Sequence, residues 1–502
     1  MSVVSGAFLL FLIAAVGVYY VFPIQYRWLV LLAASIGFYV LAGRWQFLPC
    51  IFLTTLVVWA GALRLAKLDG QLKGELAAAG KDRQRKKSLR AQYKSLRKGT
   101  LVIVLVLCIG ALVVTKFSRV VIAIAEDFMQ VNNPGTHISA EWLVMPLGIS
   151  YYTFSTVGYI LDVYWHRYEC EKSLLRLFLY AIYFPHILQG PISRYNRLGT
   201  SLRQDPHFSE LNITHGIERN IWGFFKKLII ADGCAEVVNM LWEGLGDATG
   251  LMLLVASLLF TFQIYADFSG YSDIAIGCAK LFGFRLTTNF KVPYFSRNVR
   301  EFWRRWHITL MNWFTQYVYF PLGGSRRGRA RTILNTIIVF ALSGLWHGAD
   351  WTFVLWGLYH ALLFIPLVLL GSRSHKDTVA HGRLLPSLRE LLSMLVTFLL
   401  VNFGWVLFRA PDFASFTAFT SRLFSASLFD HHGLTMRMAT MLLWCAALLI
   451  AEWMQREREH VLQIDGYRLF STQESRLLLY ALLACLIFYF AGQVQTFIYF
   501  QF

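Results

Sequence analysis

The sequence LWHGADWTFVLWGLYH occupies residues 345–360 and carries two histidines inside a run that is otherwise apolar enough to lie in lipid. A chargeable side chain at bilayer depth is costly, so it usually faces the interior of a helix bundle or a water-filled cavity. His347 and His360 are therefore candidates for function, and the run around them indicates a protein embedded in a membrane.

The composition of the whole chain is typical of a protein that crosses a membrane many times. Of its 502 residues, 56% are hydrophobic and only 15% are charged, which leaves too little polar surface to cover a water-soluble globule. The formal net charge of +18 resides mainly in short stretches between apolar runs, so it indicates positive-inside topology and contact with anionic lipid rather than with nucleic acid. The seven cysteines are widely spaced, which predicts neither disulfides nor a metal site.

We expect an all-α polytopic membrane bundle of about eleven spanning helices, with one or two re-entrant or broken elements. The apolar stretch 5–22 lacks the basic flank of a secretory signal, so it is interpreted as a retained first helix. The stretch 81–98 contains nine Lys or Arg residues and one Asp, and we expect it to be a cytoplasmic loop, which places the N-terminus outside. The segment 173–215 should be broken, because two prolines and a glycine interrupt its apolar run.

The motif around the two histidines should form a helical hairpin. A helix that starts near Thr332 should run toward His347, turn at residues 348–350 and return through the apolar residues 351–370. At the rise of an α-helix, this places His347 beyond the midplane of the hydrocarbon layer.

We expect one polytopic domain over residues 1–502. Within it, residues 1–140 form N-terminal helices with the basic stretch 81–98, residues 141–370 form the catalytic core, and residues 371–502 form C-terminal helices. No internal repeat is detectable, which counts against a secondary transporter built from duplicated halves.

His347 permits two interpretations. As a general base, its imidazole would accept a proton near neutral pH, because the ordinary pKa of histidine is about 6.5. As a structural residue, it would cap a helix end at the membrane interface. His360 is interpreted as a histidine that packs between helices.

A second histidine, His307, lies in the basic aromatic stretch REFWRRWHITLMNWF at residues 300–314. Such a stretch can simply anchor a helix at the membrane interface. It can also form a mouth for an anionic donor, with Arg300, Arg304 and Arg305 facing the phosphates and His307 pointing inward.

The stretch FQIYADFSGYSDIAIGCAKLFGF at residues 262–284 places several polar residues in an apolar span. Most of them should hold helices together through hydrogen bonds, and Gly270 and Gly277 should permit close helix contact. Asp267 and Asp273 are the exceptions that we assign to substrate or donor binding.

Common catalytic motifs are absent from the sequence. The chain contains no G-x-S-x-G elbow, P-loop, H-E-x-x-H motif or G-x-G-x-x-G motif. This excludes the commonest serine-hydrolase, NTPase, zinc-peptidase and dinucleotide-binding interpretations.

Several blocks of sequence nevertheless occur in a fixed order from residue 145 to the end of the chain. They are MPLGISYYTFSTVGYILDVYW (145–165), QGPISRY (189–195), DFSGYSDIAIG (267–277), VPYFSRNVREFWRRWHITL (292–310), YFPLGG (319–324), LWHGADWTFVLWGLYH (345–360) and FIYFQF (497–502). Together they resemble the membrane-bound O-acyltransferase family, most closely its bacterial branch, which serves alginate O-acetylation and teichoic acid D-alanylation.

The resemblance implies a helix bundle around a transmembrane tunnel. It also implies that His347, in the W-H-G motif beside Trp346, is the essential catalytic residue and that His307 is a second functional histidine. Trp346 is included with the residues that bind substrate or donor.

The function implied is transfer of an acyl group from a cytoplasmic thioester, acetyl-CoA in the first instance, to a hydroxyl of an extracytoplasmic polysaccharide. The transfer would be direct or would pass through a periplasmic or extracellular partner acyltransferase. The protein would be a multi-pass protein of the bacterial inner membrane, with no bound cofactor and with the thioester as donor substrate.

Three alternatives remain open. The same fold can move D-alanine from a carrier protein to a cell-wall polymer. A polysaccharide or acyl-group transporter without catalysis predicts that replacing His347 leaves ester chemistry intact. A scaffold for a secreted acyltransferase predicts that membrane assembly matters and the histidine does not.

Overall fold

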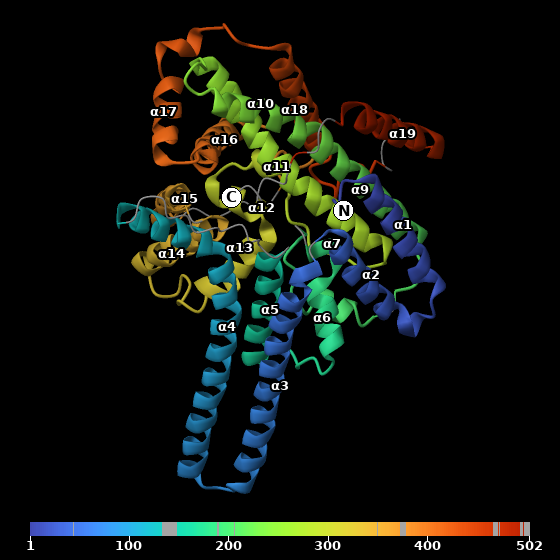
Figure 1. The fold of residues 1–502 in the computed structure, drawn as a ribbon, viewed down its shortest axis with the longest axis vertical. Coiled ribbons are helices and arrows are strands. Elements are labelled where there is room, and N and C mark those ends of the chain that lie inside the picture. Colours follow the sequence, from blue (N-terminus) through green and yellow to red (C-terminus); the bar gives the residue numbers. More distant parts are fainter. Residues whose placement is uncertain are drawn as a thin grey trace. The chain divides into compact units, whose positions relative to one another are not determined.

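The computed structural model describes residues 1–43, 45–132, 148–187, 190–204, 206–348, 350–371, 378–464, 470, 472–491 and 495. Helices dominate these ranges, and no strand occurs in them. The expected all-α fold is therefore confirmed, and Figure 1 shows the course of the chain.

The chain divides into two compact units. The first unit contains Met1–Ser209 and Phe282–Leu286, and the second contains Glu210–Leu281 and Thr287–Phe502. The single domain expected from the sequence, with divisions near residues 140 and 370, stays a prediction.

The helices of the first unit vary widely in length. They are α1 (Gly6–Val21), α2 (Arg27–Leu41), α3 (Leu48–Ala78), α4 (Arg83–Asn132), α5 (Ile149–Tyr164), α6 (Leu174–Ile182), α7 (Phe184–Ile187) and α8 (Leu198–Ser201). The last three are short and lie in the segment that two prolines and a glycine interrupt, so the broken element expected at residues 173–215 is confirmed.

Helices α3 and α4 form a long antiparallel hairpin (Figure 1). The basic stretch 81–98 is not an irregular loop, since α4 begins at Arg83, and the connection between the two helices is only residues 79–82. The stretch is rich in Lys, Arg, Leu and Gln, which favour helix, and it lacks helix breakers. Across the hairpin, Arg97 lies 3.1 Å from the carboxylate of Asp69, and the Tyr93 hydroxyl donates to Glu75 at 2.6 Å.

The second unit contains one long central helix and further helices, several of which pack against it. They are α9 (Glu210–Phe225), a π-helix (Lys226–Ala231), α10 (Asp232–Glu243), α11 (Gly250–Leu281), α12 (Val299–Arg305), α13 (Ile308–Phe314), a second π-helix (Thr315–Tyr319), α14 (Arg329–His347), α15 (Trp351–Leu369), α16 (Leu388–Arg409), α17 (Phe413–Leu423), α18 (Met436–Met454) and α19 (Gln473–Phe490). The central helix, α11, is buried over most of its length.

Glycines bring α9 and α11 into close contact, as the sequence predicted. A Cβ atom added to Gly270 would lie 2.9 Å from the carbonyl oxygen of Gly223, and one added to Gly277 would lie 2.7 Å from that of Gly216. Small residues allow membrane helices to approach in this way.

Within the described ranges, eight helices are long and apolar enough to cross a membrane. The larger number expected from hydropathy included short and interrupted segments. Helices α1 and α5 have only 16 residues each, and a π-helix interrupts the apolar segment that contains α9 and α10.

The hairpin that carries the W-H-G motif forms as predicted. Helix α14 ends at His347 and α15 begins at Trp351, and the two helices pack against each other as a hairpin. The two helices pack along their length, and this arrangement fixes the position of His347.

Candidate functional site

Trp346 joins the two histidines that the sequence singled out. Its ring centroid lies 4.7 Å from that of His347 and 6.0 Å from that of His307, which is 39 positions earlier in the chain. The three residues come from the end of α14 and from the junction of α12 and α13. We call His307, Trp346 and His347 the histidine site.

His347 lies in an aromatic wall. The ring of Trp356 is 5.1 Å away and that of Phe408 is 5.2 Å away, both nearly perpendicular to the imidazole. His347 is only 6% exposed. An imidazole in such surroundings is shielded from water and is held by packing, as a preorganised catalytic group needs to be.

Steric crowding explains why the third residue of the W-H-G motif, Gly348, is a glycine. A Cβ atom at Gly348 would lie 2.2 Å from the ring of Phe353, which a real structure cannot accommodate. Only glycine lets the start of α15 fold back closely against the end of α14. The motif therefore sets the tight turn that places His347.

His307 occupies a strained corner of the backbone. It lies between α12 and α13 with φ at +44°, a left-handed conformation that is uncommon for residues other than glycine. The preceding segment holds this corner, because the carbonyl of Asn289 accepts the backbone N–H of Ile308 at 2.9 Å. Strain of this kind is often retained at functional sites.

The side chain of Asn289 fixes which nitrogen of His307 carries the proton. Its Oδ1 accepts the backbone N–H of Thr309 at 3.3 Å and the Thr309 hydroxyl at 2.9 Å, so the atom facing these donors is the amide oxygen. The same oxygen lies 3.1 Å from Nδ1 of His307, which must therefore donate.

The other nitrogen of His307 is consequently an acceptor. Nε2 is buried and has no hydrogen-bond partner among the residues that the structure describes. His307 lies outside the eight candidate spans, and burial lowers its pKa to about 3, so its imidazole is neutral at physiological pH. A buried lone pair without a donor is a place where a reactant can bind.

His360 lies among aromatic rings, as expected of a packing histidine. Its Nδ1 accepts a hydrogen bond from the indole N–H of Trp303 at 3.3 Å. Its ring also contacts Trp356, with the two ring centroids 5.2 Å apart. His360 therefore supports the aromatic wall of the histidine site from behind Trp356.

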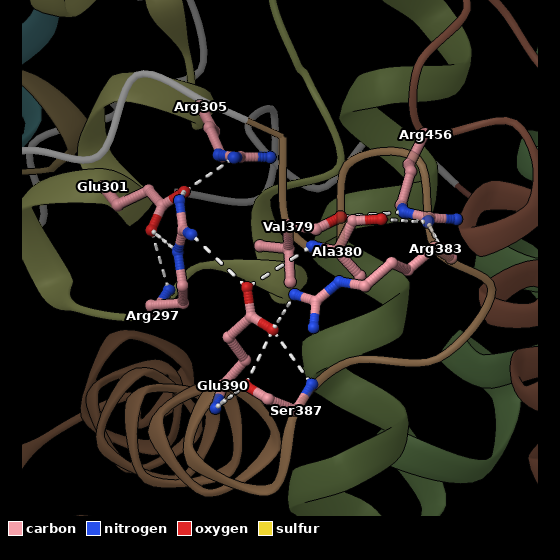
Figure 2. A network of polar contacts seen from close by, with 9 residues as sticks. All are labelled: Arg297, Glu301, Arg305, Val379, Ala380, Arg383, Ser387, Glu390 and Arg456. Atoms are coloured by element: carbon pink, nitrogen blue, oxygen red, sulfur yellow. Dashed lines mark hydrogen bonds and ion pairs between the residues drawn. The ribbon is translucent and has the colours of Figure 1, made fainter.

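The three arginines assigned to donor phosphates occupy different surroundings. Arg304 is exposed, and the guanidinium of Arg300 lies 5.9 Å from the ring centroid of Phe364. Arg305 is buried, and its guanidinium donates to Glu301 at 2.6 Å. Figure 2 shows Glu301 between Arg305 and Arg297.

The ion pairs around Glu301 extend into a larger network (Figure 2). Burial opposes the ionisation of Glu301, but hydrogen bonds from Arg297 and the charge of Arg305 hold its pKa below the usual range. Arg297 also lies 3.7 Å from Glu390, whose carboxylate caps the start of α16 through Ser387. Arg305 therefore already pairs with a protein carboxylate, whereas Arg304 is exposed, and the assignment of both to donor phosphates stays a prediction.

Asp267 and Asp273 both face cations on the neighbouring helix. Asp273 lies 2.8 Å from Arg219 and 2.5 Å from Lys226, while Asp267 lies 2.8 Å from Lys227. We call these residues, with Asp232, which lies 2.7 Å from Lys227, the ion-pair belt. The belt accounts for the burial of both carboxylates by helix packing, and their assignment to substrate or donor binding stays a prediction.

Sequence reasoning missed two sets of residues. Lys226 and Lys227 stand adjacent in the apolar stretch FFKKLIIADG, and lysines at such a depth are themselves a signal of buried ion pairs. Asn289 gave no such signal, because an asparagine in an irregular segment is ordinary and its partner is 18 positions away.

Comparison with known proteins identifies relatives of this chain. A model of the membrane-bound O-acyltransferase family matches residues 171–370. The chain is 36% identical over 411 residues to a protein of Azotobacter vinelandii named Probable alginate O-acetylase AlgI, with 81% of this chain and 75% of the relative covered. Against Pseudomonas proteins of the same name, the match covers about half of their length.

Two relatives have other names. The peptidoglycan O-acetyltransferase of Helicobacter pylori is 33% identical, with 56% of this chain and 57% of the relative covered. The teichoic acid D-alanyltransferase of Bacillus subtilis is 29% identical, with 56% of this chain and 73% of the relative covered. These names describe O-acetylation of alginate, transfer of an O-acetyl group to peptidoglycan and transfer of D-alanine to teichoic acid.

Proposed function

We propose, from the premise that the chain belongs to the membrane-bound O-acyltransferase family, that it transfers an acetyl group from an acyl thioester to a hydroxyl of an extracytoplasmic polysaccharide. As a member of this family the chain is an O-acyltransferase with a multi-pass helical fold. The observation that carries the finer proposal is the contact of Trp346 with both His307 and His347.

His347 acts as the general base in this proposal. Its imidazole takes the proton of the acceptor hydroxyl while the oxygen attacks the thioester carbonyl. The carbon–sulfur bond then breaks, and the departing thiolate receives the proton from the imidazolium, so an ester and a free thiol are formed. Proton transfer by a positioned side chain typically contributes about 100- to 10,000-fold in rate.

His307 acts as a positioning residue. An oxyanion needs a hydrogen-bond donor, but Nε2 of the neutral His307 is an acceptor in the tautomer that Asn289 sets. It would accept a hydrogen bond from an N–H or O–H of a bound reactant and orient that reactant toward His347. The aromatic wall excludes water, which would otherwise hydrolyse the thioester.

In this proposal the orientation rests on the distribution of basic residues. The basic start of α4 lies in the cytoplasm, the N-terminus lies outside, and the protein resides in the inner membrane. The donor, acetyl-CoA in the first instance, enters from the side of the basic residues at 297–305, and a transmembrane tunnel brings the acyl group to the acceptor or to a partner acyltransferase. Arg300 and Arg304 oppose the phosphates, and Arg305 shapes the entrance through its pair with Glu301.

Transfer of labelled acetyl groups into surface-polymer esters tests the proposal. Cells that carry the wild-type chain or His347→Ala are compared at matched membrane abundance, and His432→Ala, which changes an exposed histidine, serves as the control. We expect the His347 variant to lose at least about 100-fold of the incorporation rate. Incorporation at the wild-type rate would overturn the proposal and favour a transporter or a scaffold.

The D-alanyl alternative is tested by the same cells. Labelled D-alanine is supplied, and the ester fraction is hydrolysed and analysed for alanine and acetate. Acetate in the ester supports the proposal, and D-alanine in its place would assign the chain to the chemistry named for the Bacillus subtilis relative.

A further inference from the structure

Three potential metal ligands, none of which takes part in the proposed reaction, meet in the second unit. His215 and Glu218 lie one turn apart on α9, and His460 lies in the connection after α18. Their ligand atoms are Nδ1 of His215, Oε2 of Glu218 and Nε2 of His460, and each of the three lies near both of the others.

The distances within this triangle match the edges of a metal site. The two nitrogens form a hydrogen bond of 3.1 Å, and Oε2 of Glu218 lies 3.5 Å from His215 and 3.6 Å from His460. The last two distances exceed the range of a good hydrogen bond. A tetrahedral ion with bonds of about 2.1 Å separates its ligands by about 3.4 Å.

The surroundings of the triangle suit a bound ion. Glu218 and His460 are buried, whereas the side chain of His215 is 16% exposed, which leaves a direction from which a water can complete the coordination. The hydroxyl of Tyr480 donates to the other oxygen of Glu218 at 2.6 Å. Such second-layer hydrogen bonds orient ligating carboxylates in metal sites.

The nearby cations are engaged by other carboxylates. Arg219 lies 2.8 Å from Asp273, and Lys280 lies 3.8 Å from Glu459. Each of these cations therefore has a carboxylate partner outside the triangle. The triangle itself carries one carboxylate and two imidazoles, a donor set that binds borderline divalent metals well.

We propose that His215, Glu218 and His460 bind one Zn²⁺ ion, with water in the fourth position. The ion would fasten α9 to the connection after α18, and through Tyr480 the site would also involve α19. The sequence gave no hint of it, because the two histidines are 245 positions apart and no short Cys/His motif is involved.

The test uses the full chain purified in detergent, stripped with a chelator and then titrated with Zn²⁺ against a chromophoric indicator. We expect one high-affinity ion per chain and a rise in the thermal unfolding midpoint when Zn²⁺ is added. Titration with Co²⁺ should produce the intense visible absorption of a tetrahedral complex. Both responses should be lost in His460→Gln, with affinity reduced by more than about 100-fold, since even the loss of an outer-layer partner costs 10- to 100-fold.

Two further variants make the result decisive. His215→Gln changes the most exposed ligand and guards against a folding defect in His460→Gln. His381→Gln is the matched control, because His381 is exposed and lies 3.1 Å from a single carboxylate, Glu457. The proposal is overturned if the wild-type chain binds no stoichiometric Zn²⁺, or if either ligand variant binds it as tightly as the control does.

Discussion

Two regions of the second unit bury polar side chains in opposite ways. In the histidine site, His307 and His347 pack against aromatic rings, and Nε2 of His307 has no hydrogen-bond partner among the described residues. In the ion-pair belt, Asp267 and Asp273 each lie within 2.8 Å of a lysine ammonium. The histidine site therefore contains a buried hydrogen-bond acceptor that no described residue satisfies. In the ion-pair belt, each carboxylate is already paired with a cation of the same chain.

The difference separates two reasons for burying a polar group. A buried acceptor without a donor costs about 1–3 kcal/mol, so it is retained where a bound reactant will supply the donor. A buried ion pair needs no ligand, because its partner is another part of the same chain, and its removal affects assembly. We therefore expect variants of the histidine site to lose activity while they remain folded, and variants of the belt to lose stability.

The largest effect should follow from Lys227→Met. Lys227 lies 2.7 Å from Asp232 and 2.8 Å from Asp267, so its removal deprives two buried carboxylates of their shared cation. Breaking a buried ion pair costs about 3–5 kcal/mol. The thermal unfolding midpoint of the detergent-purified variant, with the yield of monodisperse protein, measures this loss.

Lys226→Met is the matched control for that variant. Lys226 is equally buried, but its partner Asp273 keeps Arg219 at 2.8 Å after the change. We expect a smaller fall in the midpoint, equivalent to about 1.5 kcal/mol. Equal falls in the midpoint for the two variants would contradict this expectation. They would show that the loss of stability does not depend on how many carboxylates are left without a cation.

The next effect concerns the histidine site. His307→Asn keeps a residue that tolerates positive φ and an amide that can donate to Asn289, but it removes the acceptor Nε2. One hydrogen bond to a reactant is worth about 1 kcal/mol, so the rate of acetyl transfer should fall about 5-fold while the unfolding midpoint stays near that of the wild type. His307→Leu loses both contacts, and a fall in its midpoint would separate the structural role of Nδ1 from the role of Nε2.

The sequence predicted the fold class, whereas the contacts of the site residues could be read only from the structure. Hydropathy and basic stretches predicted a polytopic helical protein, and the hairpin around the W-H-G motif followed from residue spacing, because these signals are local in sequence. The contact of Trp346 with His307 joins two helical segments that pack only in the folded chain. A single sequence does not reveal that contact, although the family resemblance pointed to both residues.

The charged residues could not be assigned in this way, because their roles depend on which partner lies opposite. Arg305 belongs to a basic stretch that suggested phosphate binding, yet Glu301, four positions earlier on α12, takes its charge. Asp267 and Asp273 were predicted to bind substrate or donor because they lie in an apolar span. In the structure, the adjacent lysines of the π-helix form ion pairs with them. A carboxylate at membrane depth shows that a partner exists, and only the fold shows which one.

The smallest effect should follow from Glu171→Gln, which breaks a partly exposed ion pair with Arg203 in the first unit. Glu171 is buried and accepts hydrogen bonds from Tyr195 at 2.6 Å and from Nε of Arg203 at 2.9 Å, while the side chain of Arg203 is 43% exposed. Burial would raise the pKa of Glu171, but these hydrogen bonds hold it below its usual value.

Because the folded pKa of Glu171 is depressed, its pair with Arg203 stabilises the protein fully above the unfolded pKa of about 4.3. This stabilisation is lost as the pH falls through the folded pKa. Since water reaches Arg203, Glu171→Gln should cost only about 1 kcal/mol at neutral pH. The difference in unfolding midpoint between wild type and variant should stay constant from neutral pH down to about pH 5 and narrow below about pH 4. A difference as large as that of Lys227→Met would mean that exposure does not reduce the cost of breaking a satisfied pair in this protein.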